Sequence, residues 1–175
     1  LWNLRTLYIG PLFEAPEIIP AASSLVIGLD EEIVFHLRKS RQSVRTRIAL
    51  LPAGVAFGAE TGRNTVAMLY LDPVGHDLRL LRKRMGTTTG EIFHDCTHET
   101  ELIESLRQIF LNISPAAETY RLLQEKVFLP AGSSDFRHDV DPRIWHTINY
   151  VKTHAMDNLS SQTLAEQVGM SEAQL

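Results

Sequence analysis

Apolar and polar residues alternate in short runs through the first part of the chain. In the run SSLVIGL, Leu25, Ile27 and Leu29 fall on one face, residues 33–37 repeat this pattern, and residues 64–71 form the longest run. A period of two over four to eight residues is typical of a β-strand with one buried face. Several short strands separated by turn residues predict a small sandwich or barrel, with the first two runs joined as a hairpin.

After Pro73 the apolar residues recur at intervals of three and four, which is the period of an amphipathic helix. The strongest example covers residues 98–113, where Thr97 can cap the first turn. Its apolar stripe is wide for one packing face, so we expect it to contact a second copy of the chain. The alternative is that the stripe packs on the strands. The candidate dimer residues are Leu102, Leu106, Ile109, Phe110 and Ile113.

Residues 130–140 separate this part of the chain from the C-terminal part. They contain proline, glycine, serine and charged residues without a period, which is typical of a linker. Asp141 and Pro142 then suit the N-cap and the first turn of a new helix. The pattern predicts an α+β chain, with a domain of strands followed by helices over residues 1–129 and a helical domain over residues 141–175.

The last residues, 159–175, have the spacing of two short helices around a tight turn. Leu164 and Val168 lie one helical turn apart, and Gly169 follows where a positive φ would turn the chain. Ser171 then stands at an N-cap position. This spacing is typical of a DNA-binding helix-turn-helix, and a simple corner between two helices with a glycine turn also has it.

The segment DPRIWHTINYVKTHAMDNLSSQTLAEQVGMSEAQL resembles the opening of the DNA-binding domain of AraC-type transcription regulators. The resemblance implies an N-terminal cupin-like barrel or sandwich that senses a small molecule, helices that form a homodimer, and binding to DNA. Since the binding domain of that family is about three times as long as this segment and has two helix-turn-helix units, we expect the domain to be incomplete here. The residues that match the family pattern are Leu164, Ala165, Gly169, Met170, Ser171 and Leu175, while Thr163 stands where the family often has a small or apolar residue.

The residues after the turn would begin the helix that faces DNA in such a regulator. Acidic residues outnumber basic ones from Asp141 onward, and the whole chain has a formal net charge of −4. Because affinity for DNA comes largely from Lys and Arg that neutralise phosphates, we expect the full-length protein, and not this chain alone, to bind DNA. The candidate DNA-contacting residues are Ser171, Glu172, Ala173 and Gln174, of which glutamine is able to read adenine.

The same resemblance places an unidentified small-molecule effector inside the strand-rich domain. Inward positions alternate along the strands of a barrel, so alternate apolar residues are candidates to line a largely apolar pocket. The candidate effector-binding residues are Phe35, Leu37, Phe57 and Met68 for the lining, with His36 and Glu60 at the rim.

Cupin folds are often metalloenzymes, and the residues argue against that function. Where the second cupin motif has a metal-binding histidine after Pro-x-Gly, this chain has Phe57 after Pro52-Ala53-Gly54. An aromatic ring cannot coordinate a divalent metal, and His36 is the only histidine in the strand region. The segment HDCTHE indicates the start of a helix better than a zinc site, since its spacing fits no usual zinc pattern. We therefore expect no metal, no cofactor and no enzymatic activity.

The composition bears on the cellular compartment and leaves the hypothesis of a transcription regulator unchanged. The single cysteine, Cys96, favours a reducing cytoplasm, and no apolar run approaches the roughly 20 residues of a membrane-spanning helix. The alternative hypothesis is a free-standing cupin-like small-molecule-binding protein that does not bind DNA. A basic cluster on a predicted helix is expected to be solvated, or else to bind an anionic effector; its members are Arg79, Arg82, Lys83 and Arg84.

Overall fold

The structure is a computed structural model that describes most of the chain. The chain divides into two units, Leu1–Ser134 and Asp135–Leu175. The predicted linker at residues 130–140 lies outside the described residues. The described residues are 5–12, 14–72, 77–112, 115–128, 142–154 and 156–174.

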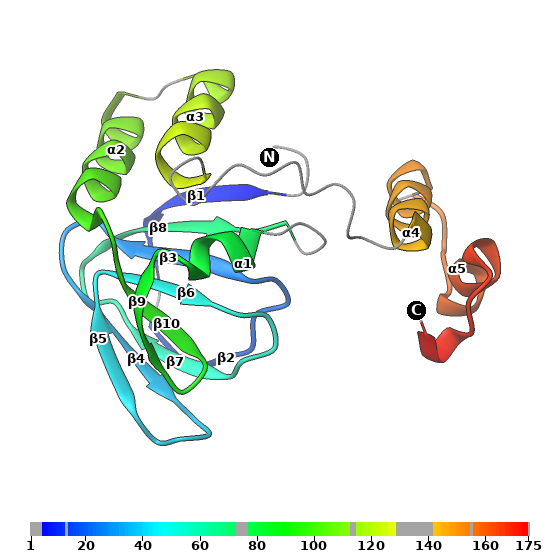
Figure 1. Ribbon diagram of the computed structural model, residues 1–175, viewed down its shortest axis with the longest axis horizontal. Coiled ribbons are helices and arrows are strands. Elements are labelled where there is room, and N and C mark those ends of the chain that lie inside the picture. The colour runs from blue at the N-terminus through cyan, green and yellow to red at the C-terminus, as the bar shows by residue number, and fades with distance from the viewer. Residues whose placement is uncertain are drawn as a thin grey trace. The chain divides into compact units, whose positions relative to one another are not determined.

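The first unit contains two antiparallel sheets (Figure 1). The larger sheet has the strand order β1-β8-β3-β6-β10-β9, and the smaller sheet has the order β2-β7-β4-β5. The predicted α+β class is confirmed, and the strands form two sheets instead of a closed barrel. The strands are β1 (Thr6–Pro11), β2 (Ala15–Ile18), β3 (Ser24–Gly28), β4 (Ile33–Leu37), β5 (Ser43–Thr46), β6 (Ile48–Leu51), β7 (Phe57–Glu60), β8 (Thr65–Tyr70), β9 (Met85–Thr89) and β10 (Ile92–Cys96).

One apolar layer lies between the two sheets. Val26 of β3 pairs in register with Met68 of β8, and Phe35 of β4 pairs with Ala59 of β7. All four are buried in one apolar cluster to which both sheets contribute. Along β4, buried positions alternate with partly exposed ones, so the predicted period of two is confirmed for this strand.

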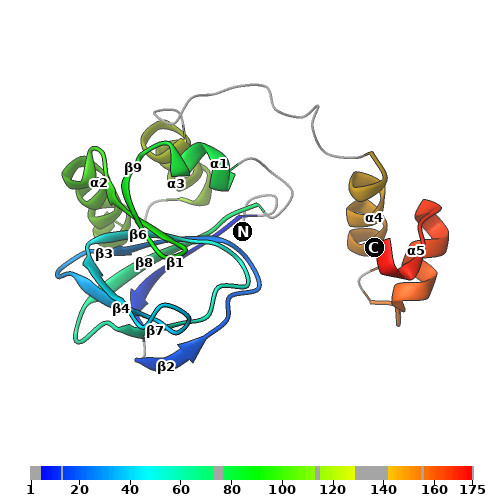
Figure 2. The same ribbon diagram turned by 60° about the horizontal axis from the view of Figure 1, so that its bottom comes forward.

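A second apolar layer lies on the other face of the larger sheet, where helices cover it (Figure 2). Leu25 of β3 and its neighbour Leu50 of β6 are buried in one cluster with Leu102 and Leu106 of α2. The larger sheet is therefore the middle of three layers and is apolar on both faces. The covering helices are α1 (Asp77–Arg82), α2 (Glu99–Asn112), α3 (Ala116–Leu123) and the π-helix η1 (Gln124–Phe128).

The predicted hairpin between the first two strand runs is wrong. β3 pairs with β6 and β8, whereas β4 pairs with β5 and β7, so the chain crosses from one sheet to the other after Gly28. The buried side chain of Asn64 holds the crossing turn. Its Oδ1 accepts hydrogen bonds from the backbone N–H groups of Asp30 (2.9 Å) and Glu31 (3.2 Å), and its Nδ2 donates to the carbonyl of Glu31 (2.6 Å). These bonds satisfy polar groups that the turn would otherwise bury unpaired.

A bidentate ion pair ties the N-terminal strand region to the helices. The Nε and Nη2 atoms of Arg5 each donate to the Asp77 carboxylate at 2.6 Å, at the start of α1. The guanidinium also lies 4.3 Å from the ring centroid of Phe128 in η1. The pKa of Arg5 is raised above its ordinary value, mainly because of the hydrogen bonds to Asp77. The pair therefore joins three elements that are distant in the sequence.

Replacing Asp77 with alanine should lower the free energy of unfolding of the first unit by about 3 kcal/mol, because Arg5 would keep its charge without a partner. Urea denaturation followed by circular dichroism measures this loss. The matched control is Glu125→Ala, which removes the exposed pair with Arg121 and should cost less than about 0.5 kcal/mol. Equal losses in the two variants would contradict the role given to Asp77.

The second unit consists of α4 (Pro142–Thr153), α5 (Ser161–Val168) and the 3₁₀-helix η3 (Glu172–Gln174). Ser160 caps α5 by accepting a hydrogen bond from the N–H of Thr163 at 3.1 Å. Gly169 ends α5 in the left-handed conformation, with φ of 64°, as the sequence predicts. Ala165 and Val168 are buried, so α5 presents the expected apolar face inside this unit.

Candidate functional site

The structure brings together the four residues predicted to line the effector pocket. Phe35, Leu37, Phe57 and Met68 are all buried in the layer between the sheets. The rings of Phe35 and Phe57 meet edge to face, with centroids 5.8 Å apart. The result is an apolar, aromatic-rich interior, and its use as a ligand site stays a prediction.

The two predicted rim residues lie on the outer face of the smaller sheet. His36 is partly exposed and Glu60 is exposed, and the Nε2 atom of His36 lies 2.8 Å from Oε1 of Glu60. The Nδ1 atom of His36 lies 2.8 Å from the Ser43 hydroxyl. Because side chains alternate along a strand, His36 points away from the interior that Phe35 and Leu37 enter.

Three of the predicted dimer residues are buried within the first unit. Leu102, Leu106 and Ile109 pack against the larger sheet, as the alternative interpretation of the stripe requires. Phe110 is 46% exposed, and Leu111, which the sequence analysis did not select, is 71% exposed. Ile113 lies outside the described residues. Of the predicted dimer residues that the structure describes, Phe110 is the one that stays exposed, and its use as a dimer contact stays a prediction.

The predicted DNA-contacting residues follow the glycine turn of the second unit. Ser171, Glu172 and Ala173 are exposed, and the side chain of Gln174 lies outside the described part. The hydroxyl of Ser161, at the start of α5, donates a hydrogen bond to the Glu172 carboxylate. This bond joins the first turn of α5 to η3.

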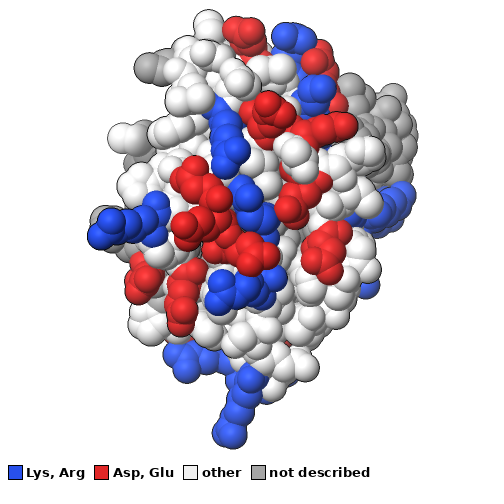
Figure 3. Space-filling view, turned by 90° about the vertical axis from the view of Figure 1, so that its left-hand side faces the viewer, with Lys and Arg blue, Asp and Glu red and all other residues white. Residues whose placement is uncertain are grey.

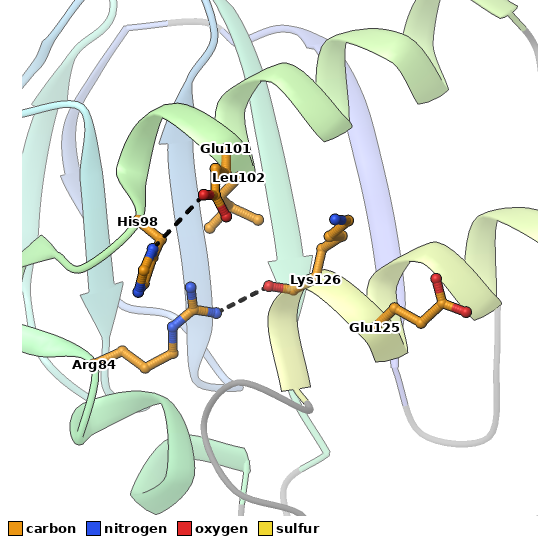
Figure 4. Close-up of a pocket in the computed structure, with 6 residues that line it drawn as sticks. All are labelled: Arg84, His98, Glu101, Leu102, Glu125 and Lys126. Carbon is orange, nitrogen blue, oxygen red and sulfur yellow. Dashed lines mark hydrogen bonds and ion pairs between the residues drawn. The ribbon is translucent and has the colours of Figure 1, made fainter.

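A pocket of about 200 Å³ lies beside α2 and η1 in the first unit (Figure 4). Sequence analysis missed it, because Arg84 reads as part of an exposed basic helix. The structure places Arg84 after the end of α1, with 5% of its surface exposed. The lining residues are Arg84, His98, Glu101, Leu102, Glu125 and Lys126.

Basic and acidic side chains are interspersed on the face of the protein shown in Figure 3. That face therefore lacks the continuous Lys and Arg surface that favours nucleic-acid phosphates. Among the described residues, no group of three or more His, Cys, Asp or Glu is placed to hold a metal ion. No helix in the described part of the chain is long and apolar enough to cross a membrane.

Comparison with solved structures shows a shared fold. An apo variant of ToxT from Vibrio cholerae strain SCE256 superposes with a TM-score of 0.58 at 11% identity, covering 99% of this chain and 73% of that one. ToxT from Vibrio cholerae O395 gives a TM-score of 0.52 at 11% identity, with coverages of 96% and 70%. The AraC-like transcriptional activator CuxR gives 0.45 at 10% identity, with coverages of 89% and 59%.

At 11% identity, the likeness to the two ToxT structures shows that this chain shares their fold. No protein-family model and no curated protein matches the sequence.

Proposed function

We propose that this chain is the effector-sensing part of an AraC-type transcription regulator, followed by the first helices of its DNA-binding domain. The observation that carries the proposal is the fold shared with ToxT, which extends over 99% of this chain. The cap at Ser160 and the left-handed turn at Gly169 support a helix-turn-helix in the second unit. The protein acts in the cytoplasm on DNA and catalyses no reaction.

The effector binds in the layer between the two sheets. Its ligand is a largely apolar small molecule, because the lining residues Phe35, Leu37, Phe57 and Met68 offer hydrocarbon and aromatic surface. One ToxT structure, with a TM-score of 0.50, is bound to (E)-4-(8-methylnaphthalen-1-yl)but-3-enoic acid. That compound, here called the naphthyl-butenoic acid, is a suitable probe because its two fused rings can pack against Phe35 and Phe57.

Phe57→Leu should weaken binding of the naphthyl-butenoic acid about fivefold, because it removes one ring contact worth about 1 kcal/mol. Isothermal titration calorimetry measures the dissociation constant. The matched control is Phe128→Leu, which removes a buried ring on the helical side of the larger sheet. The control should bind the acid within about twofold of wild type.

Equal weakening in the two variants would place the binding site elsewhere. Absence of binding by the wild-type chain would contradict the proposed sensing function for this class of ligand. If the chain binds the acid and the full-length protein does not bind DNA, the alternative hypothesis of a free-standing small-molecule-binding protein would hold instead.

The dimer contact is formed by the exposed end of α2. Phe110 and Leu111, at consecutive positions of the helix, expose large apolar side chains, whereas Leu106 and Ile109 are buried in the core. Burying the two exposed side chains against a second copy would remove their apolar surface from water. In the complete protein, Ser171, Glu172, Ala173 and Gln174 begin the segment that faces the major groove.

The double substitution Phe110→Ser with Leu111→Ser should convert a dimeric chain into folded monomers, which sedimentation velocity distinguishes. The control is Ile19→Ser, which removes an exposed apolar side chain just after β2 and should leave the dimer intact. Dimers that persist in the double variant, or a wild-type chain that sediments as a monomer, would contradict the assignment.

A further inference from the structure

Arg84 is a buried cation held by backbone carbonyl groups. Its Nη1 atom donates to the carbonyls of Lys126 (3.1 Å) and Val127 (2.8 Å), and its Nη2 atom donates to that of Thr97 (3.2 Å). The first two carbonyls lie near the end of η1, where helical carbonyl groups lack partners of their own. Arg84 thus fastens η1 to the turn that precedes α2, which is a structural role.

This structural role leaves part of the guanidinium unused. A guanidinium has five N–H donors, and the three bonds to carbonyls occupy three of them. The buried Nε atom has no hydrogen-bond partner among the described residues. One N–H of Nη2 is also left over, and no described carboxylate forms an ion pair with Arg84.

Arg5 shows what such a pair of donors does in this protein. Its Nε and Nη2 atoms form a fork that binds both oxygens of the Asp77 carboxylate, each at 2.6 Å. Planar, two-point binding of this kind is the strongest way in which arginine holds a carboxylate. In Arg84 the Nε atom lacks a partner, and Nη2 has one N–H left besides its bond to the Thr97 carbonyl.

The charges around the pocket at Arg84 allow a ligand to bring the missing carboxylate. In Figure 4 the guanidinium points into the space between His98 and Lys126, and the Glu125 side chain turns away from it. Glu125 is paired with Arg121 at 2.7 Å, and Glu101 lies 3.9 Å from His98. The ammonium group of Lys126 has no ion pair among the described residues. In Figure 4 it points away from the Arg84 guanidinium, so it adds positive charge at the rim of the pocket.

We propose that this pocket binds the carboxylate group of a small monoanionic ligand. Arg84 holds the carboxylate through Nε and Nη2, Lys126 adds positive charge at the rim of the pocket, and Leu102 contacts the apolar part of the ligand. Glu101 at the same pocket disfavours a dianion such as phosphate. The site is separate from the layer between the sheets and does not depend on the proposed sensing function.

The position of the pocket gives such a ligand a definite structural effect. It would join the start of α2 to η1, which is the last described element of the first unit. π-Helices are rare and occur frequently at functional sites. A carboxylate in this pocket should therefore stabilise η1 in addition to occupying the free donors of Arg84.

Titration of the chain with benzoate and with its neutral analogue benzamide tests the proposal, using two-dimensional amide NMR spectra. Benzoate should shift the signals of Thr97, His98 and Lys126 in a saturable manner, and benzamide should not. Lys126→Ala should weaken benzoate binding about tenfold, because it removes one of two cations. The matched control is Lys83→Ala, an exposed lysine beside Arg84 that should change binding by less than about twofold.

Arg84→Lys keeps the positive charge and removes the fork, so saturable binding should be lost. If that variant does not fold, the comparison of Lys126→Ala with Lys83→Ala decides. Equal shifts with benzoate and benzamide, or equal affinities in the two lysine variants, would overturn the site. Inorganic phosphate that binds as tightly as benzoate would overturn its assignment to a carboxylate.

Discussion

The larger sheet must be buried on both faces, and the other elements of the first unit follow from this constraint. Every residue of β3 and of β6 is buried. Alternate side chains of these strands enter two different interiors, one shared with the smaller sheet and one shared with the helices. The fold therefore needs both the smaller sheet and α2, because each of them removes one apolar face of the larger sheet from water. The same division separates the two ligand sites proposed above, which lie on opposite sides of the sheet.

The part of this architecture that depends on local periodicity could be predicted from the sequence, and the part that depends on strand pairing could not. The alternation in β4 identified Phe35 and Leu37 as inward residues correctly. The segment that forms β3 is apolar on both faces. Its sequence pattern does not indicate that it pairs with β6 and β8. The stripe on α2 was also read correctly as apolar. A helix pattern shows that a face must be covered without showing what covers it, so the burial of Leu106 needed the structure.

The partly buried Arg5 and the buried Arg84 are the clearest case of features that sequence patterns miss. Arg5 pairs with Asp77, which is 72 residues away in the sequence. Arg84 donates to carbonyls of η1 that are 42 and 43 residues away. Charged residues next to a helix usually lie in solvent, and only the three-dimensional arrangement shows that these two do not. The contrast between them supports the proposed second site, since one guanidinium has a carboxylate and the other has only carbonyl groups. The helix-turn-helix is the opposite case, because the cap at Ser160 and the turn at Gly169 follow from local sequence.

The central claim is that the effector enters the layer between the two sheets, and the methionine methyl groups report on it directly. The chain has four methionines. Met68 belongs to the layer between the sheets, Met85 packs against the helical layer, and Met156 and Met170 lie in the second unit. Carbon-13 methyl NMR spectra recorded during titration with the naphthyl-butenoic acid should show the Met68 signal moving while the Met156 signal stays in place. Movement of Met85 with an unchanged Met68 would put the ligand on the other side of the larger sheet and contradict the account.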